Sequence, residues 1–152
     1  MAHRYLIGAA LSEKVSTPTG VDYSEDILAS IDCLRSLGAD VSTDGDTVTI
    51  DPKDFLQVEK PVLNCRESGS TLRFMLPIVG ALGVDGIFQM EGRLPQRPLS
   101  PLWEEMERMG CTLSRPSEDT IRCEGKLKAG AYVIDGSVSS QFITGLLFAL
   151  SL

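Results

Sequence analysis

Three segments of the chain place polar or charged side chains at the start of an apolar helix, an arrangement suited to binding an anion. They begin at Ala2, Glu67 and Ser137, and each continues as a run of mainly apolar residues. The N-terminus of a helix carries unpaired N–H groups and about half a positive charge, so it attracts phosphate or carboxylate. Three such helix starts in one chain predict a small ligand with several negative charges.

Arginines stand close to these helix starts. Arg4 and Arg73 belong to the first two segments, and the loop of residues 93–98 adds Arg93 and Arg97. A guanidinium binds carboxylate or phosphate through two parallel hydrogen bonds. Solvated arginines and ordinary helix caps are the alternative interpretation, and the spacing of the residues does not exclude it.

Other kinds of chemistry find little support in the sequence. The chain has four cysteines and one histidine, His3, and none of the cysteines forms a Cys-x-x-Cys pair. This pattern argues against a zinc site and favours buried free thiols, and we expect His3 to be a surface residue. No phosphate-binding or dinucleotide-binding glycine loop occurs, and no pair of nucleophile and base is recognisable.

The composition limits the partners. A net charge of −7 and a pI of about 4.7 argue against nucleic acid as a partner, because binding it needs a basic surface. The longest apolar run, residues 74–82, is too short to span a bilayer and contains Pro77 and Gly80. No secretory signal is visible at the start, so we expect a cytoplasmic protein with no membrane partner.

Periodicity and punctuation predict the elements that must position these residues. Ser24 and Gly38 delimit a helix with an apolar stripe, and a strand pair turns at Asp44-Gly45 within residues 41–50. A second helix is expected over residues 99–109. Further strands are expected at residues 62–65, 86–90, 111–114, 120–123 and 131–134.

The order strand, helix, strand, helix and two strands recurs at an interval of about 70 residues, which is the length of a whole supersecondary unit. We expect unit one at about residues 1–60 without its opening strand, unit two at about 61–130, and the start of unit three at 131–152. The predicted fold is α+β, built from βαβαββ units that pack as one body. Because the third unit is incomplete, we expect a fragment, either engineered or an incomplete gene product.

Three motifs resemble the signature segments of the 5-enolpyruvylshikimate-3-phosphate (EPSP) synthase family. They cover residues 67–73, 92–98 and 135–142, and Gly-Ser-Val-Ser-Ser-Gln-Phe in the last is the most specific. The resemblance extends over essentially the whole chain. It implies a two-domain protein in which each domain holds three βαβαββ units, an inside-out α/β barrel, and residues 1–152 are then part of one domain.

The resemblance also implies an activity. The family transfers the enolpyruvyl group of phosphoenolpyruvate to the 5-hydroxyl of shikimate 3-phosphate and releases phosphate, in the pathway to chorismate and the aromatic amino acids. Glyphosate competes for the phosphoenolpyruvate site, and no cofactor or metal is expected. By motif, Arg4 contacts shikimate 3-phosphate, Ser139 and Ser140 hold its phosphate, and Gln141 lies between the two substrates.

Phosphoenolpyruvate is assigned by the same resemblance to Gly69, through its backbone, and to Arg97, through its charge. Arg73 and Arg93 are expected to support the site. The family carries a Gly-Ser-Lys-Ser segment before the position of Arg4, and here Met1 stands in its place. Since that lysine and the opposite domain are missing, we identify no catalytic residue and expect the chain alone to be inactive.

Two alternatives stay open. UDP-N-acetylglucosamine enolpyruvyl transferase shares the fold, but that family has a cysteine in the loop that corresponds to residues 93–97, where this chain has none. A non-catalytic anion-binding or assembly module is the second. We also expect self-association through an uncovered apolar face made of Phe142, Ile143, Leu146, Leu147 and Leu150.

Overall fold

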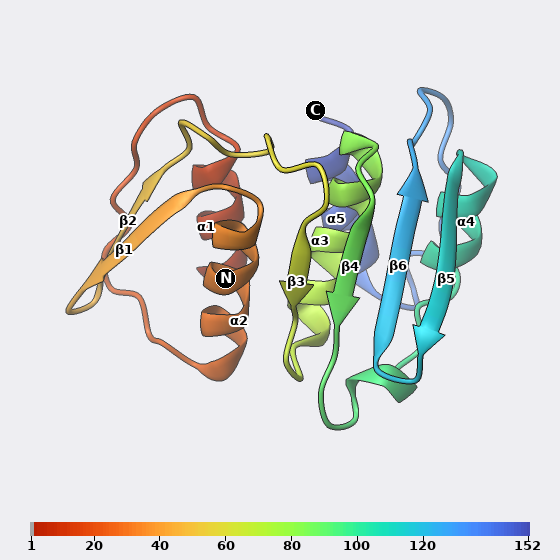
Figure 1. Ribbon diagram of the computed structural model, residues 1–152, viewed down its shortest axis with the longest axis horizontal. Helices are drawn as coiled ribbons and strands as arrows, with labels where there is room; N and C mark the ends of the chain where they lie inside the picture. The colour runs from red at the N-terminus through yellow and green to blue at the C-terminus, as the bar shows by residue number, and fades with distance from the viewer. Residues whose placement is uncertain (1) are drawn as a thin grey trace.

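A computed structural model describes residues 2–152. The chain opens with two helices and a strand pair: α1 (Ala2–Ala10), α2 (Glu25–Ser36), β1 (Asp40–Asp44) and β2 (Thr47–Asp51) (Figure 1). The Ser24 hydroxyl accepts a hydrogen bond from the backbone N–H of Ile27, 3.4 Å away, and so caps α2 as expected. Gly45 turns the β1–β2 hairpin with a φ of 58°, a conformation that favours glycine.

The following residues form one complete βαβαββ unit around a four-stranded sheet. Its strands lie in the order β3-β4-β6-β5, with β3 and β4 parallel and the other pairs antiparallel. The elements are β3 (Val62–Asn64), α3 (Gly69–Leu82), β4 (Gly86–Gln89), the short 3₁₀ helix η1 (Leu94–Gln96), α4 (Leu102–Arg108), β5 (Cys111–Ser117) and β6 (Thr120–Gly125). The parallel pair needs a crossover connection, and α3 provides it.

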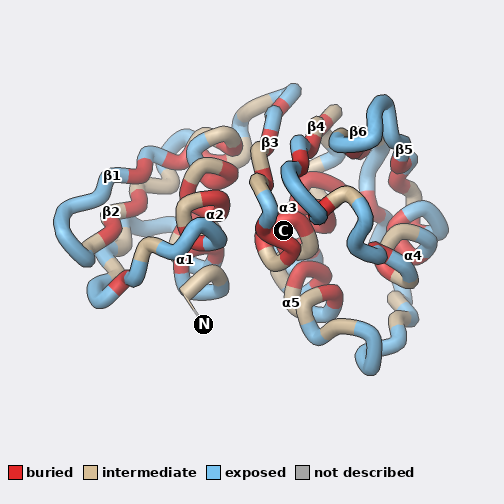
Figure 2. The backbone as a smooth tube through the Cα atoms, turned by 90° about the horizontal axis from the view of Figure 1, so that it is seen from below, coloured by how far each residue is buried: buried red, intermediate tan, exposed pale blue. Residues whose placement is uncertain are grey.

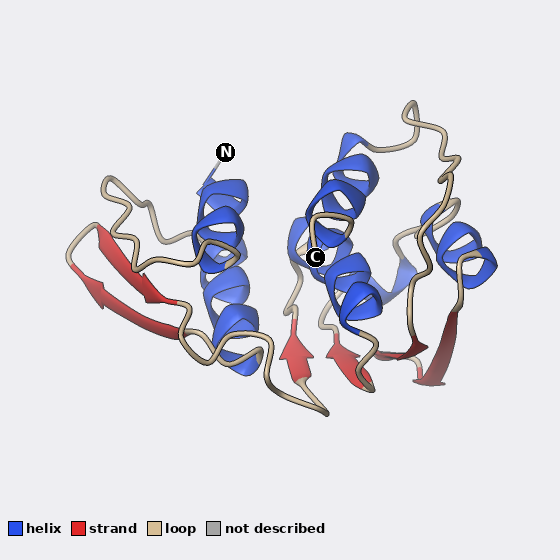
Figure 3. Cartoon of the chain, turned by 90° about the horizontal axis from the view of Figure 1, so that it is seen from above, coloured by secondary structure: helices blue, strands red, loops and turns tan. Residues whose placement is uncertain are grey.

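The helices α3, α4 and α5 (Ser140–Ala149) lie on one face of this sheet, and the β1–β2 hairpin flanks α1 and α2 (Figure 3). Buried residues run along the inner sides of α2 and α3 (Figure 2). One apolar core joins residues from both parts of the chain. The α+β class is therefore confirmed, and the predicted element order is present in full from β3 to β6.

The packing of α5 on α3 depends on a proline and a glycine. Pro77 lies inside α3 without ending it, and its missing N–H leaves the carbonyl of Arg73 without its usual partner in the helix. Gly145 of α5 faces this carbonyl so closely that a Cβ at position 145 would collide with the oxygen. The two helices therefore approach each other closely at a point where α5 presents no side chain and α3 presents a backbone carbonyl and the ring of Pro77.

Three details of the sequence prediction need correction. Residues 131–134 form no strand, because their backbone bonds to α4: Glu105 accepts from the N–H of Val133, and Arg108 donates to the carbonyl of Ala131. The helix expected from residue 99 begins at Leu102, directly after Pro101. The loop of residues 93–98 contains the 3₁₀ turn η1.

The expected apolar face of α5 is only partly exposed. Phe142 and Leu146 are buried, since both belong to the apolar core. The side chains that remain exposed are those of Ile143, Leu147 and Leu150 (39%, 66% and 49%). Within residues 2–152, no helix has the length and apolar character that crossing a membrane requires.

Candidate anion-binding site

The first turn of α3 is built to let a side chain approach its backbone. Ser68 caps the helix by accepting a hydrogen bond from the N–H of Thr71 at 3.2 Å. The next residue, Gly69, is buried beneath Arg97, which follows η1. The Arg97 Nη1 atom lies 2.9 Å from the point where a Cβ on Gly69 would stand. A glycine is therefore required if Arg97 is to lie against this helix start.

The first turn of α5 is tied to that of α3 by one side chain. Ser139 caps α5 by accepting a hydrogen bond from the N–H of Gln141 at 3.2 Å. The Gln141 Oε1 atom accepts from Arg73 Nη1 at 2.9 Å, and its Nε2 atom donates to Ser70 Oγ at 2.6 Å. Gln141 thus uses both ends of its amide to hold the two helix starts together, a role that capping alone would not require.

Arg73 brings a second positive charge to this place. Its side chain is half-buried, its guanidinium lies 5.3 Å from the centre of the Phe142 ring, and its Nη2 atom donates to the carbonyl of Pro98 at 3.3 Å. Burial lowers the pKa of Arg73, and the positive charge of Arg97 lowers it further. Two neighbouring guanidiniums therefore repel each other, and a bound anion would relieve that repulsion.

Arg4 reaches the same group of helices from α1. Its guanidinium lies 5.3 Å from the centre of the Phe74 ring on α3, and its Nε and Nη2 atoms lie 3.4 Å and 3.3 Å from Thr144 Oγ1 on α5. The Arg4 side chain is exposed, as is Ser140 at the first position of α5. Arg93 is exposed at the start of η1, where its side chain makes no hydrogen bond to residues 2–152.

The ion pairs of the described residues include four arginines and leave five without a carboxylate partner, with Arg115 among the five. Among residues 2–152, carboxylates pair with Arg35, Arg66, Arg108 and Arg122. None of those pairs includes any of the four arginines that the sequence pattern selected, namely Arg4, Arg73, Arg93 and Arg97. Of the unpaired arginines, Arg73 and Arg97 lie together beside the starts of α3 and α5, and positive charges at that place suit an external anion.

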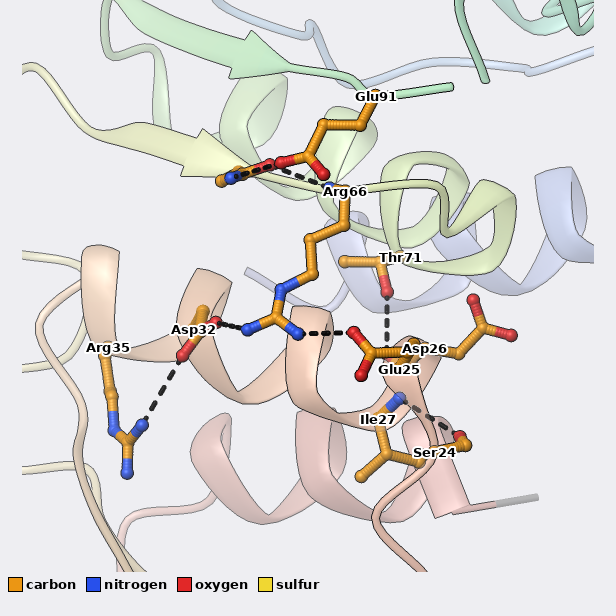
Figure 4. Close-up of polar contacts among 10 residues, drawn as sticks. Ser24, Glu25, Asp26, Ile27, Asp32, Arg35, Arg66, Thr71 and Glu91 are labelled. Atoms are coloured by element: carbon orange, nitrogen blue, oxygen red, sulfur yellow. Dashed lines mark hydrogen bonds and ion pairs between the residues drawn. The ribbon is translucent and has the colours of Figure 1, made fainter. Parts of the chain in front are cut away.

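The sequence pattern did not predict a role for Arg66. Arg66 follows β3 and pairs with two carboxylates of α2, Glu25 and Asp32, each at 2.7 Å (Figure 4). The hydrogen bond to Glu25 raises the pKa of Arg66. Its backbone has a φ of 50°, and its N–H donates to Asn64 Oδ1 at 2.8 Å. Arg66 therefore fixes the segment that leads into α3 against α2, and no sequence motif marks that role.

The remaining chemistry-bearing residues do not form a second site here. The four cysteines are free and buried, as expected, and no group of three metal-ligating side chains occurs within residues 2–152. A cavity of about 1070 Å³ borders Arg97, but Gly69 and Gln141 do not line it. His3 is half-buried rather than a surface residue, since its ring contacts Ser30 and Phe74.

Comparisons with known proteins agree with the motifs. The family model of EPSP synthase (3-phosphoshikimate 1-carboxyvinyltransferase) matches residues 1–152. The 3-phosphoshikimate 1-carboxyvinyltransferase of Clostridium kluyveri is 42% identical over 153 residues, which cover 100% of this chain and 36% of the relative. The enzyme of that name from Clostridium beijerinckii is 40% identical over 160 residues, covering 100% of this chain and 37% of the relative.

A solved structure shares the fold. EPSP synthase from Acinetobacter baumannii superposes with a TM-score of 0.81 at 22% identity, covering 97% of this chain and 35% of that one. The chain thus spans little more than a third of the length of the relatives it matches. Because the family model matches from the first residue to the last and relatives at 40% identity align along the whole chain, the chain belongs to the EPSP synthase family.

Proposed function

We propose that this chain supplies the part of an EPSP synthase site that binds shikimate 3-phosphate and phosphoenolpyruvate. In the whole protein, the enolpyruvyl group of phosphoenolpyruvate would pass to the 5-hydroxyl of shikimate 3-phosphate with release of phosphate. The observation that carries the proposal is the convergence of Arg97, Gly69, Arg73 and Gln141 at two helix starts, with no carboxylate paired to either arginine within residues 2–152. Family membership gives that site its substrates.

The proposed assignment of residues to the two substrates follows from the resemblance of the motifs to the family, and the positions of the residues are compatible with it. Arg97 lies against the start of α3, and we assign it with Gly69 to phosphoenolpyruvate. Ser139 and Ser140 begin α5, and we assign them with Arg4 to shikimate 3-phosphate. Their hydroxyls and the helix dipole suit a phosphate group.

Gln141 stands between these two groups and orients Arg73 through its amide oxygen. Arg73 is the second guanidinium beside Arg97, and we assign it a supporting role, as we do Arg93. Binding and orientation of two anions would therefore be the contribution of this chain to catalysis.

The same residues account for the expected inactivity of the chain alone. A guanidinium stays protonated at neutral pH, and a glutamine side chain does not ionise, so Arg97, Arg73 and Gln141 can neither take up nor release a proton during the reaction. Transfer of the enolpyruvyl group needs proton transfer. A steady-state assay should accordingly detect no phosphate release by this chain above the rate without protein.

Titration of shikimate 3-phosphate into labelled protein, followed by backbone amide NMR, tests the proposed binding. Shifts should concentrate at Arg4, at Ser139 and Ser140, and at Gln141, which lies beside them. Replacing Arg97 by glutamine should weaken the binding of phosphoenolpyruvate roughly tenfold or more, since a charge-assisted pair is lost. The matched control is Arg115→Gln, which removes the same charge from a guanidinium that stacks on Trp103. Equal loss in both variants would contradict the proposal.

The same experiments also test the two alternative functions. Binding of UDP-N-acetylglucosamine in place of shikimate 3-phosphate would favour the related transferase. A chain that binds the anions but gives no activity when the rest of an EPSP synthase is supplied separately would favour a non-catalytic binding module. Restored phosphate release in that mixture would support the enzyme.

The organisation of the chain is also part of the proposal. We place unit one at about residues 1–60, unit two at about 61–130 and the start of unit three at 131–152, in a cytoplasmic protein. The exposed side chains of Ile143, Leu147 and Leu150 would mediate self-association of the chain. Sedimentation should then show a dimer that Leu147→Glu dissociates, and a concentration-independent monomer would contradict this part.

A further inference from the structure

Only four polar side chains are buried among residues 2–152, and three of them belong to one hydrogen-bonded chain. They are Ser30, Ser68 and Thr71, each no more than 2% exposed. Thr71 Oγ1 lies 2.8 Å from both Ser68 Oγ and Ser30 Oγ, and Ser30 Oγ lies 2.8 Å from His3 Nδ1. Burying hydroxyls is costly unless they are paired, so this chain is a specific feature of the core.

The hydrogen-bonded chain links three helices at their site-bearing residues. His3 lies on α1 directly before Arg4, and Ser30 lies on α2. Ser68 and Thr71 flank the pair of residues 69–70 at the start of α3, where Arg97 and Gln141 make their contacts. This series of hydrogen-bonded side chains therefore connects the two ends of the proposed site through the interior of the protein.

With Nδ1 of His3 as the acceptor, the donors and acceptors run in one direction in which every hydroxyl is paired. Ser68 Oγ already accepts from the N–H of Thr71 and has no other partner in residues 2–152, so its proton must point to Thr71 Oγ1. Thr71 then donates to Ser30 at 2.8 Å in preference to the carbonyl of Asp26 at 3.3 Å. Ser30 in turn donates to Nδ1 of His3, which requires the neutral tautomer that carries its proton on Nε2.

Protonation of His3 would change this direction. A protonated Nδ1 can only donate, so Ser30 would accept from His3 and donate to Thr71. Thr71 would then have to turn its own proton to the carbonyl of Asp26, the contact drawn in Figure 4. One ring proton thereby decides whether Thr71 is bonded through Ser30 or directly to the first turn of α2.

The surroundings of His3 favour the neutral form. Burial lowers the pKa of His3 below its usual value, the carboxylate of Asp26 opposes this, and the positive charge of Arg4 adds to the lowering. The remaining neighbour on α3 is the edge of the Phe74 ring, 6.2 Å away between ring centres. At neutral pH, with the ring proton on Nε2, the chain of hydrogen bonds runs from Ser68 to His3.

We propose that His3, Ser30, Thr71 and Ser68 form a positioning relay that holds the first turn of α3 against α1 and α2, and that the protonation state of His3 sets its direction. The relay does not touch a substrate. It acts by fixing Gly69 and Ser70 relative to Arg4, and through their positions it affects ligand affinity. The effect on affinity rests on the proposed function, whereas the relay itself does not.

NMR can test the relay without any ligand, because His3 is the only histidine of the chain and its ring signals are unambiguous. At high pH, ¹⁵N shifts should show the ring proton on Nε2 and an acceptor at Nδ1. As pH is lowered, the amides of residues 69–71 should shift with the midpoint of the His3 ring. In Ser30→Ala the ring should still titrate while these amides no longer follow it.

The variants separate a relay from a structural role. Thr71→Val should abolish the coupling of the amides to His3, and Thr71→Ser should restore it, since only the hydroxyl is needed. Ser36→Ala, on the same helix as Ser30, is the control and should change nothing. Amides that follow His3 equally well in Ser30→Ala would show a through-space field instead, and a Nδ1 proton at high pH would overturn the assigned direction.

Binding of shikimate 3-phosphate adds the second readout. Thr71→Val should weaken it about five- to tenfold, the loss expected for one buried hydrogen bond, with Thr71→Ser close to the original protein. If the original protein binds no shikimate 3-phosphate while the NMR coupling is present, the proposed function fails and the relay stands. If it binds and the coupling is absent, the relay fails and the proposed function stands.

Discussion

Replacing Gly145 by alanine should destabilise the protein although alanine is the better helix former. Alanine in a helix interior gains about 0.5–1 kcal/mol over glycine. At position 145 the added Cβ collides with the carbonyl of Arg73, a backbone atom that cannot turn aside. Overpacking of this kind costs about 1–3 kcal/mol or more, because α5 must move away from α3 and loosen Phe142 and Leu146.

Gly8 provides the matched control. It also lies within a helix, α1, but nothing stands within 4 Å of the position of its missing Cβ. Gly8→Ala should therefore stabilise the protein by about 0.5–1 kcal/mol. For a chain of 152 residues, 1 kcal/mol changes Tm by about 2–4 °C, so the two variants should separate in opposite directions by several degrees.

Urea and thermal unfolding, followed by circular dichroism, measure both changes. The displacement of α5 should also break the contact between Gln141 and Arg73, so Gly145→Ala should weaken anion binding while Gly8→Ala leaves it unchanged. A Gly145→Ala variant that is as stable as Gly8→Ala would refute the close approach of α5 to α3.

Three further predictions follow from single side chains. Ser139→Ala should lower the free energy of unfolding by about 1 kcal/mol, because α5 loses its cap. Ser139→Asp can still cap the helix, so urea unfolding should show an unchanged stability. A phosphate titration should nevertheless show no binding to Ser139→Asp, because the new carboxylate brings negative charge to the site. Glu105→Gln should reduce the dependence of folding stability on pH in acid. Hydrogen bonds from Arg108 lower the pKa of Glu105, so the stabilising contribution of its carboxylate is present above the unfolded-state pKa and is lost as pH falls. Unfolding measured at several pH values will show the difference. A thiol reagent should not react with the folded protein and should react four times after unfolding, because all four cysteines are buried. Hydrogen bonds to neighbouring thiols, with burial, also raise the pKa of Cys33 and Cys123. The hydrogen bond with Cys123 lowers the pKa of Cys111, so at that residue burial alone prevents the reaction.

Local signals in the sequence predict the elements well where punctuation is strong. Ser24 and Gly38 delimit α2, and the hairpin turns at Gly45, because caps and turns depend on a few neighbouring residues. Residues 131–134 defeat the same reasoning. Their continuous run of apolar residues is typical of a strand, but Glu105 and Arg108 bind their backbone from another element, and no local pattern reveals that.

The candidate site, too, could be predicted from the sequence only in part. The segments that carry Gly69 and Gln141 could be selected from residue types, because helix starts and guanidiniums attract anions whatever the fold. Which arginines lack a carboxylate partner depends on contacts far apart in sequence, as the pairing of Arg66 with α2 shows. The burial of His3 likewise follows from how α1 lies on α2 and α3.

The uneven neutralisation of the arginines has a kinetic consequence. A chain with net charge −7 repels anions on average, yet the guanidiniums of Arg4, Arg73 and Arg97 pair with no carboxylate in residues 2–152. A local group of unpaired cations produces a positive potential at the helix starts within a negative background, so an approaching anion is attracted there and repelled by the net charge elsewhere. Capture should therefore be fast in dilute buffer and slow steeply as salt shortens the screening length to about 8 Å, while dissociation changes less.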